Sequence, residues 1–202
     1  MGESMRRGLK VGILALTGLS LCIVFVYTCR GAPWPDPPLL IAASKGDEQE
    51  VRHLLNAGEP VNSVNENGET ALVRAFQSRN MQMFDLLLEK GANLNALTNR
   101  GETALSFAVR SGDQIWIKHL IGLGALRVYT DTSSSNWHHS PLHEAAGKGD
   151  DQSVTLLISS GMDPLLRDED GLTPLDWARR ARRRSTIAIL KGLTKNATQH
   201  ER

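Results

Sequence analysis

A group of histidines near residue 140 is the part of the chain that most resembles a metal site. His138, His139, His143 and Glu144 lie within seven consecutive residues, and imidazoles with a carboxylate suit zinc. In the alternative interpretation, His143 lies beside the helix-capping hydroxyl of Ser140, and the other two histidines lie on an exposed loop. Short histidine spacings match metal motifs by accident. We therefore predict that no metal binds here.

A dense basic run near the C-terminus is the second candidate. It contains Arg179, Arg180, Arg182, Arg183 and Arg184. Residues 177–202 carry a net charge of +7, against −9 for residues 31–176. Such a run can bind nucleic acid, acidic lipid or an acidic protein surface. We expect a solvated face on a terminal unit and regard nucleic acid as the least suitable ligand. Contacts with lipid headgroups or with the chain's own acidic surface stay open.

The sequence has no pattern typical of a catalytic site. It lacks a glycine-rich phosphate loop after a strand and a Gly-x-Ser-x-Gly motif, and its two cysteines, Cys22 and Cys29, precede the body of the chain. We therefore expect no enzyme activity, no cofactor and no small-molecule substrate.

A repeat of 33 residues determines where the polar side chains must lie. Gly58, Gly91 and Gly124 are 33 residues apart, and Gly161 follows after 37. One alanine and one leucine mark each of five units: Ala42, Ala75, Ala108, Ala145 and Ala178, and Leu54, Leu87, Leu120, Leu157 and Leu190. A unit of this size cannot bury its own apolar face, so the pattern predicts a stack of interdependent units.

Residues that begin and end helices recur in the same phase. Hydroxyls that can cap the first helix of a unit are Thr70, Thr103, Ser140 and Thr173, with Asp36 before Pro37 expected to do the same in the first unit. Glycines expected to end helices are Gly46, Gly112 and Gly149 after first helices, and Gly58, Gly91, Gly124 and Gly161 after second ones. Arg79 and Arg182 stand where the pattern expects glycine.

These residues resemble the ankyrin repeat. The closest copies are Gly68-Glu-Thr-Ala-Leu72 with Leu87-Leu-Glu-Lys-Gly-Ala-Asn93, and Ser140-Pro-Leu-His-Glu-Ala-Ala-Gly-Lys-Gly149. The resemblance implies an all-α solenoid of about five helix-turn-helix repeats with short β-hairpin fingers. The expected repeats are about 36–67, 68–100, 101–137, 138–170 and 171–193, within a domain at 36–193 that precedes a polar tail at 194–202.

In ankyrin-like folds the finger tips and first helices form the surface that binds a partner protein. Carried onto this sequence, that surface comprises Glu66, Asn67, Glu69, Gln77, Ser78, Asn99, Arg100, Glu102, Arg110, Trp137, His139, Lys148, Glu169 and Asp170. Trp137 is either an interface anchor or a cover for its own finger. The resemblance thus implies a protein-binding scaffold whose partner the sequence does not identify.

The N-terminal part predicts a membrane anchor. A basic segment at 1–10 precedes an uncharged run at 11–29, which as a helix is about 28 Å long and long enough to span a bilayer. A proline-rich linker follows at 30–38. The charge bias keeps the N-terminus in the cytoplasm and places the repeats in the periplasm or another extracytoplasmic space. Cleavage of the segment, leaving a soluble periplasmic domain, is the alternative.

Three functions fit these features. The first is a tethered protein-interaction scaffold that resembles exported bacterial ankyrin proteins. The second is an inhibitor or immunity protein for a secreted toxic enzyme. The third is an adaptor that contacts acidic lipid through the C-terminal arginines.

Overall fold

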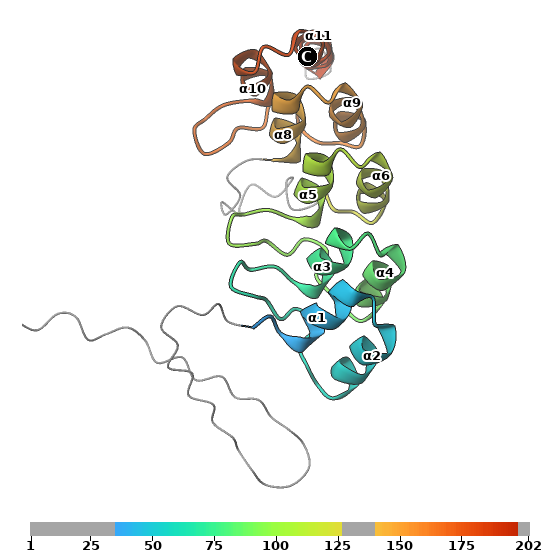
Figure 1. The fold of residues 1–202 in the computed structure, drawn as a ribbon. Coiled ribbons are helices and arrows are strands. Elements are labelled where there is room, and N and C mark those ends of the chain that lie inside the picture. Colours follow the sequence, from blue (N-terminus) through green and yellow to red (C-terminus); the bar gives the residue numbers. More distant parts are fainter. Residues whose placement is uncertain (1–34, 127–139, 198–202) are drawn as a thin grey trace, which may run out of the picture.

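A computed structural model describes residues 35–126 and 140–197. The described chain forms five pairs of antiparallel helices that stack into one elongated body (Figure 1). The pairs are α1 (Pro38–Lys45) with α2 (Glu48–Asn56), α3 (Ala71–Gln77) with α4 (Met81–Glu89), α5 (Ala104–Ser111) with α6 (Gln114–Gly122), α8 (Pro141–Lys148) with α9 (Asp151–Ser159), and α10 (Pro174–Arg180) with α11 (Arg184–Ala197).

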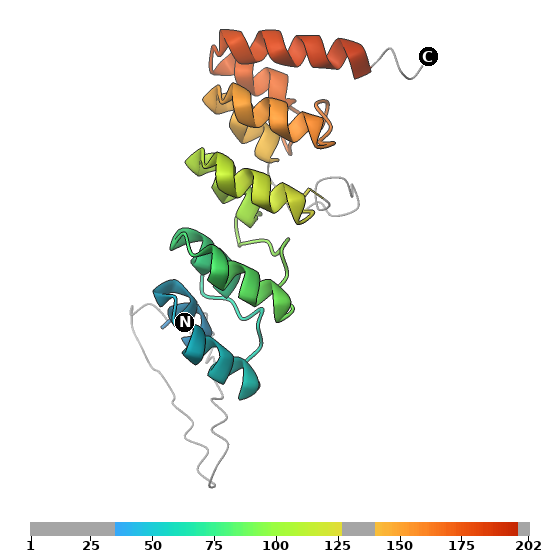
Figure 2. The ribbon, with the colours of Figure 1, turned by 90° about the vertical axis from the view of Figure 1, so that its right-hand side faces the viewer.

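The helices form two parallel columns. The inner column is built by α1, α3, α5, α8 and α10, each in contact with the next. The second helices form the outer column, which faces the viewer in Figure 2. The predicted all-α solenoid of five helical units is therefore confirmed. The predicted N-terminal hydrophobic helix at 11–29 lies outside the described residues.

The fingers between units differ from the predicted β-hairpins. Within the described residues there is no strand, only an isolated antiparallel bridge between Val64 and Thr70. The cause is local side-chain bonding: Asn65 Oδ1 accepts the backbone N–H groups of Asn67 and Glu69, both at 3.0 Å. The side chain closes the tip within a few residues, so the loop is too short for a ladder of backbone hydrogen bonds.

The predicted hydroxyl caps start the inner helices. Thr70 accepts the N–H of Val73, and Thr103 and Thr173 form reciprocal capping boxes with Ser106 and Asp176. The hydrogen bonds from Thr173 to the Asp176 carboxylate, with help from Arg179, hold the pKa of Asp176 below its ordinary value.

The first unit departs from the expected capping. Pro37, one residue later than predicted, is the N-cap of α1 and makes no side-chain cap. Asp36 instead forms an ion pair with Arg74 of the next unit at 2.7 Å. The N-terminus of α1 is capped by a residue outside the helix: Glu59 Oε1 accepts the backbone N–H of Leu39 at 3.2 Å. The prediction of an Asp36 cap was wrong for this reason.

Left-handed residues end the inner helices in every unit. Gly46, Gly112 and Gly149 adopt positive φ there, as predicted. In the other two units the equivalent residues are Arg79 (φ 56°) and Arg182 (φ 57°), the two non-glycine residues with positive φ in the described chain. The backbone thus keeps the turn geometry of the repeat even where a side chain makes it costly.

The seams between units form one continuous core. All five repeat alanines are buried, and so are the repeat leucines apart from Leu54, which is half-buried. Trp116 of α6 fills the space between the second and third units. Its ring packs edge-on against those of Phe76 and Phe84, with distances of 5.1 and 5.0 Å between ring centres. Small alanines let the inner helices approach, and large side chains fill the space behind them.

Candidate functional site: the concave surface

The finger tips of the second and third units are joined to each other. The backbone N–H of Asn99 donates to the carbonyl of Asn67 at 2.9 Å, and its side-chain amide donates to the carbonyl of Glu66 at 2.7 Å. Gly68 is required here, because a Cβ at that position would lie 2.6 Å from Asn99 Oδ1. These bonds fix the spacing of the two tips, so they form one preformed surface.

A polar depression of about 200 Å³ lies beneath these tips. The predicted residues that line it are Asn67, Glu69, Asn99, Arg100, Glu102 and Arg110. Thr98 and Phe107 complete the lining and were not predicted. The floor is already charge-paired: Arg110 bonds to Glu102, lies 3.8 Å from Glu144, and places its guanidinium 5.4 Å from the centre of the Phe107 ring.

Three other predicted residues lie around this depression, and the side chain of each already makes a hydrogen bond within the protein. Gln77 donates to Glu69 at 3.0 Å. The hydroxyl of Ser78 is turned onto its own helix, where it donates to the carbonyls of Arg74 and Ala75. Lys148 donates to the carbonyl of Arg110 across the seam between α5 and α8.

The remaining predicted contact residues are not part of this depression. Glu169 and Asp170 are exposed at the tip of the last finger, away from the second and third units. Trp137 and His139, like His138, lie outside the described residues.

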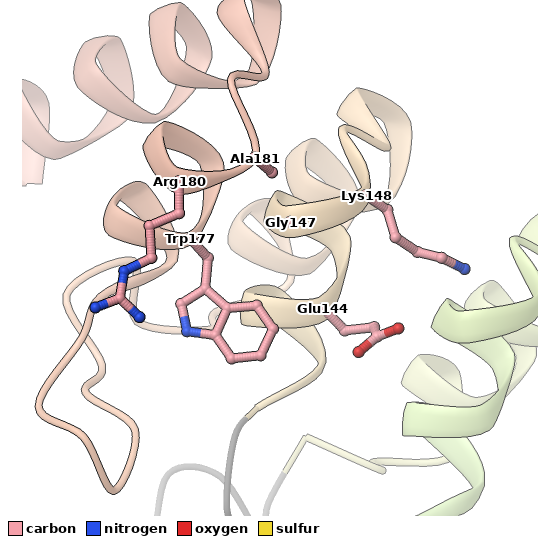
Figure 3. A pocket seen from close by; sticks show the side chains of 6 residues that line it. All are labelled: Glu144, Gly147, Lys148, Trp177, Arg180 and Ala181. Carbon is pink, nitrogen blue, oxygen red and sulfur yellow. The ribbon is translucent and has the colours of Figure 1, made fainter.

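A second depression, of about 380 Å³, lies between α8 and α10 (Figure 3). It is lined by Glu144, Gly147, Lys148, Trp177, Arg180 and Ala181. Lys148 was predicted as a contact residue and Arg180 as part of the basic run. Trp177, Gly147 and Ala181 were missed. The signal was in the sequence, because Trp177 and Glu144 occupy the same position of successive units, 33 residues apart.

Trp177 is held in place by its polar edge. Its indole Nε1–H donates to Asp168 Oδ2 at 2.7 Å. Burial opposes ionisation of Asp168, yet the hydrogen bonds from Trp177, Leu172 and Asp170 help to leave its pKa below the ordinary value. The anchor is thus a carboxylate that stays charged at neutral pH, and the indole ring is fixed against the finger.

His143 has a structural role. It is fully buried, its Nδ1 accepts the N–H of Ser140 at 3.3 Å, and its Nε2 lies 3.0 Å from the carbonyl of Leu172. A carbonyl oxygen only accepts hydrogen bonds, so Nε2 donates to it. Both nitrogens are occupied, so His143 has no lone pair for a metal, which agrees with the capping interpretation. Glu144 faces the second depression instead.

The basic run is distributed over three kinds of position. Arg179 forms an ion pair with Asp176 at 3.1 Å, and Arg183 donates to the carbonyl of Gly147 at 3.1 Å. Arg182 lies in the turn between α10 and α11 with positive φ, Arg184 begins α11, and Arg180, the last residue of α10, lines the second depression. All five residues are exposed.

Stacked helical hairpins with polar side chains on their finger tips and inner helices define a class of protein-binding scaffolds, which typically lack enzyme activity. Family models of the ankyrin repeat match residues 39–130, as three copies, and residues 137–169. These matches cover more than half of the chain, and the protein belongs to the ankyrin-repeat family. The last helical pair, α10 and α11, lies beyond both matches and is seen in the structure alone.

Similar curated proteins include the mitochondrial disaggregases of Bos taurus, 29% identical over 184 residues, and of Homo sapiens, 28% identical over 203 residues. Each alignment covers 83% of this chain but only 25% and 29% of the relatives. The chain thus spans about a quarter of their length. Both relatives are mammalian, so they give no support to the expected bacterial exported type.

None of the described helices is long and apolar enough to cross a membrane. The predicted anchor at 11–29 was outside that search.

Proposed function

We propose that the chain binds a partner protein on the concave surface of its repeats. The observation that carries this proposal is the joined pair of finger tips at Asn67 and Asn99 above a polar depression. Rigid tips lose little conformational entropy when a partner docks. Arg100, exposed at the tip of the third-unit finger, offers a planar donor group that suits an interface.

Site-specific photocrosslinking tests this proposal. A photoreactive residue at Arg100 is expected to capture a partner from the native membrane or soluble fraction. The same residue at Lys118, exposed on the outer helix α6, is the control and is expected to capture little. Equal capture from the two positions, or none from Arg100, would contradict a concave binding surface.

We further propose that residues 11–29 tether the repeats to a membrane, with the basic N-terminal flank on the side of synthesis. The support is the uncharged length of the segment and the basic residues before it. Alkaline extraction of membranes from cells that express the full chain should leave it in the pellet, and deletion of residues 11–29 should release it. A protease-protection assay of a tag after Arg202 reports the side of the membrane. A tag exposed on the cytoplasmic side would refute the extracytoplasmic placement.

A further inference from the structure

The depression between α8 and α10 exists because one side chain is missing from a row. The seventh residue after the N-cap occupies the same position in four successive inner helices: it is Gln77 in α3, Arg110 in α5, Gly147 in α8 and Arg180 in α10. At Gly147 the row is open, and the space that a long side chain would fill lies beside Trp177 (Figure 3).

Backbone geometry does not require a glycine at this position. Gly147 lies within α8 and is not among the residues with positive φ. Glycine is a poor helix former, so its presence here weakens the helix. A Cβ at Gly147 would lie 3.1 Å from Cε3 of Trp177, closer than ordinary contact. The glycine therefore lets the indole pack closely against α8, and a larger side chain here would press on the ring and enter the depression beside it.

The charges around the space favour an acidic ligand. Glu144 is 3.8 Å from Arg110, so its charge is partly balanced by a group outside the depression. Lys148 also lines the depression, but its ammonium group points away from Trp177 and donates to the carbonyl of Arg110 across the seam (Figure 3). Within the described residues, the side chain of Arg180 makes no ion pair or hydrogen bond. The depression thus has an apolar wall from Trp177, a carboxylate next to Arg110, and a guanidinium, that of Arg180, which no described carboxylate pairs.

From this geometry we infer that the space beside Trp177 and Gly147 binds a large apolar or aromatic side chain of a partner peptide, next to an acidic residue that pairs with Arg180. This inference rests on the proposed protein-binding function and identifies the partner's chemistry. The aromatic ring gains from packing on the indole, and the carboxylate gains a planar donor. A cationic ligand is disfavoured by the positive charge of Arg180.

Selection of short random peptides displayed on phage, using the full chain as bait, tests the inference. Peptides are selected on the wild type and counter-selected on Gly147→Leu, which places a side chain against the indole and into the depression. The selected peptides are expected to carry an aromatic or large aliphatic residue beside Asp or Glu. They should bind Gly147→Leu and Arg180→Gln at least about tenfold more weakly than the wild type.

Two variants are matched controls. Gly192→Leu makes the same change on an exposed face of α11, where a Cβ would have no neighbouring side chain within 4 Å. Arg184→Gln removes the same charge outside the depression. Both should bind the selected peptides like the wild type. Far-ultraviolet circular dichroism during heating checks that every variant is folded.

Three results would overturn the inference: no peptide that discriminates wild type from Gly147→Leu, winners rich in Lys or Arg, or winners without acidic residues that bind Arg180→Gln normally. Sedimentation with phosphatidylserine vesicles that Arg180→Gln weakens, without any discriminating peptide, would assign the arginine to a membrane and also reject it. If the crosslinking at Arg100 captures a partner while the peptide test fails, the proposed function stands and only this depression is misassigned.

Discussion

Arg79 offers a direct test of how strongly the repeat imposes its backbone on the sequence. It adopts φ 56° after α3, where three other units use glycine and the fifth uses Arg182. For a residue with a Cβ this conformation costs about 1–2 kcal/mol. Glycine removes that cost but gives the unfolded chain more freedom, which offsets about 0.4–1 kcal/mol. Taking the middle of each range, the net gain expected for glycine over alanine at this position is about 0.8 kcal/mol in the free energy of unfolding.

The ion pair of Arg79 must be separated from this backbone effect. Its guanidinium lies 3.6 Å from Asp113, but the side chain is 75% exposed, so the pair contributes about 0–0.5 kcal/mol. Arg79→Ala removes the pair and keeps the Cβ, whereas Arg79→Gly removes both. Urea unfolding followed by circular dichroism should show Arg79→Gly more stable than Arg79→Ala. Equal stability of the two variants, or a more stable alanine variant, would refute the reasoning.

Three further outcomes follow from the packing, capping and charge described above. Leu157→Ala, at a fully buried seam, should lower the free energy of unfolding by about 2–5 kcal/mol in urea titrations. Thr103→Ala should lower it by about 1 kcal/mol through loss of the capping box, and Thr103→Ser should restore most of it. Because the folded-state pKa of Asp168 is lowered, its contribution is present above the ordinary value of 3.8 and lost as pH falls through the lower folded value. Asp168→Asn should therefore flatten the fall in urea midpoint below about pH 4, and an unchanged acid profile would contradict this.

The repeat architecture was readable from sequence because its signals recur in phase. A glycine, an alanine and a leucine at one period identify units that no single copy would establish. The inner-helix caps were readable for the same reason. The outer-helix caps were missed although Asp47, Asn80, Asp113 and Asp150 accept N–H groups at the start of the first four outer helices. They were overlooked because Asp and Asn are also common in turns, where they have no fixed partner.

The surface was harder to predict than the core. The joined tips depend on Asn99 reaching a unit 33 residues earlier, and the period places those residues side by side. The period does not reveal where a long side chain is replaced by glycine, however, so it did not single out Gly147. Its meaning depends on the ring of Trp177, which belongs to the next unit. Likewise, Asp36 was assigned to its own helix because the distant Arg74 could not be foreseen.

The columnar contacts between successive helices also have a mechanical consequence. Each inner helix touches the next, so load applied along the column passes through one seam after another. Stretching should peel hairpins away singly from a weak end and release similar lengths of chain at each step. Such a stack should unfold stepwise under tension. A partner bound to two neighbouring fingers should raise the force needed to separate the seam between them.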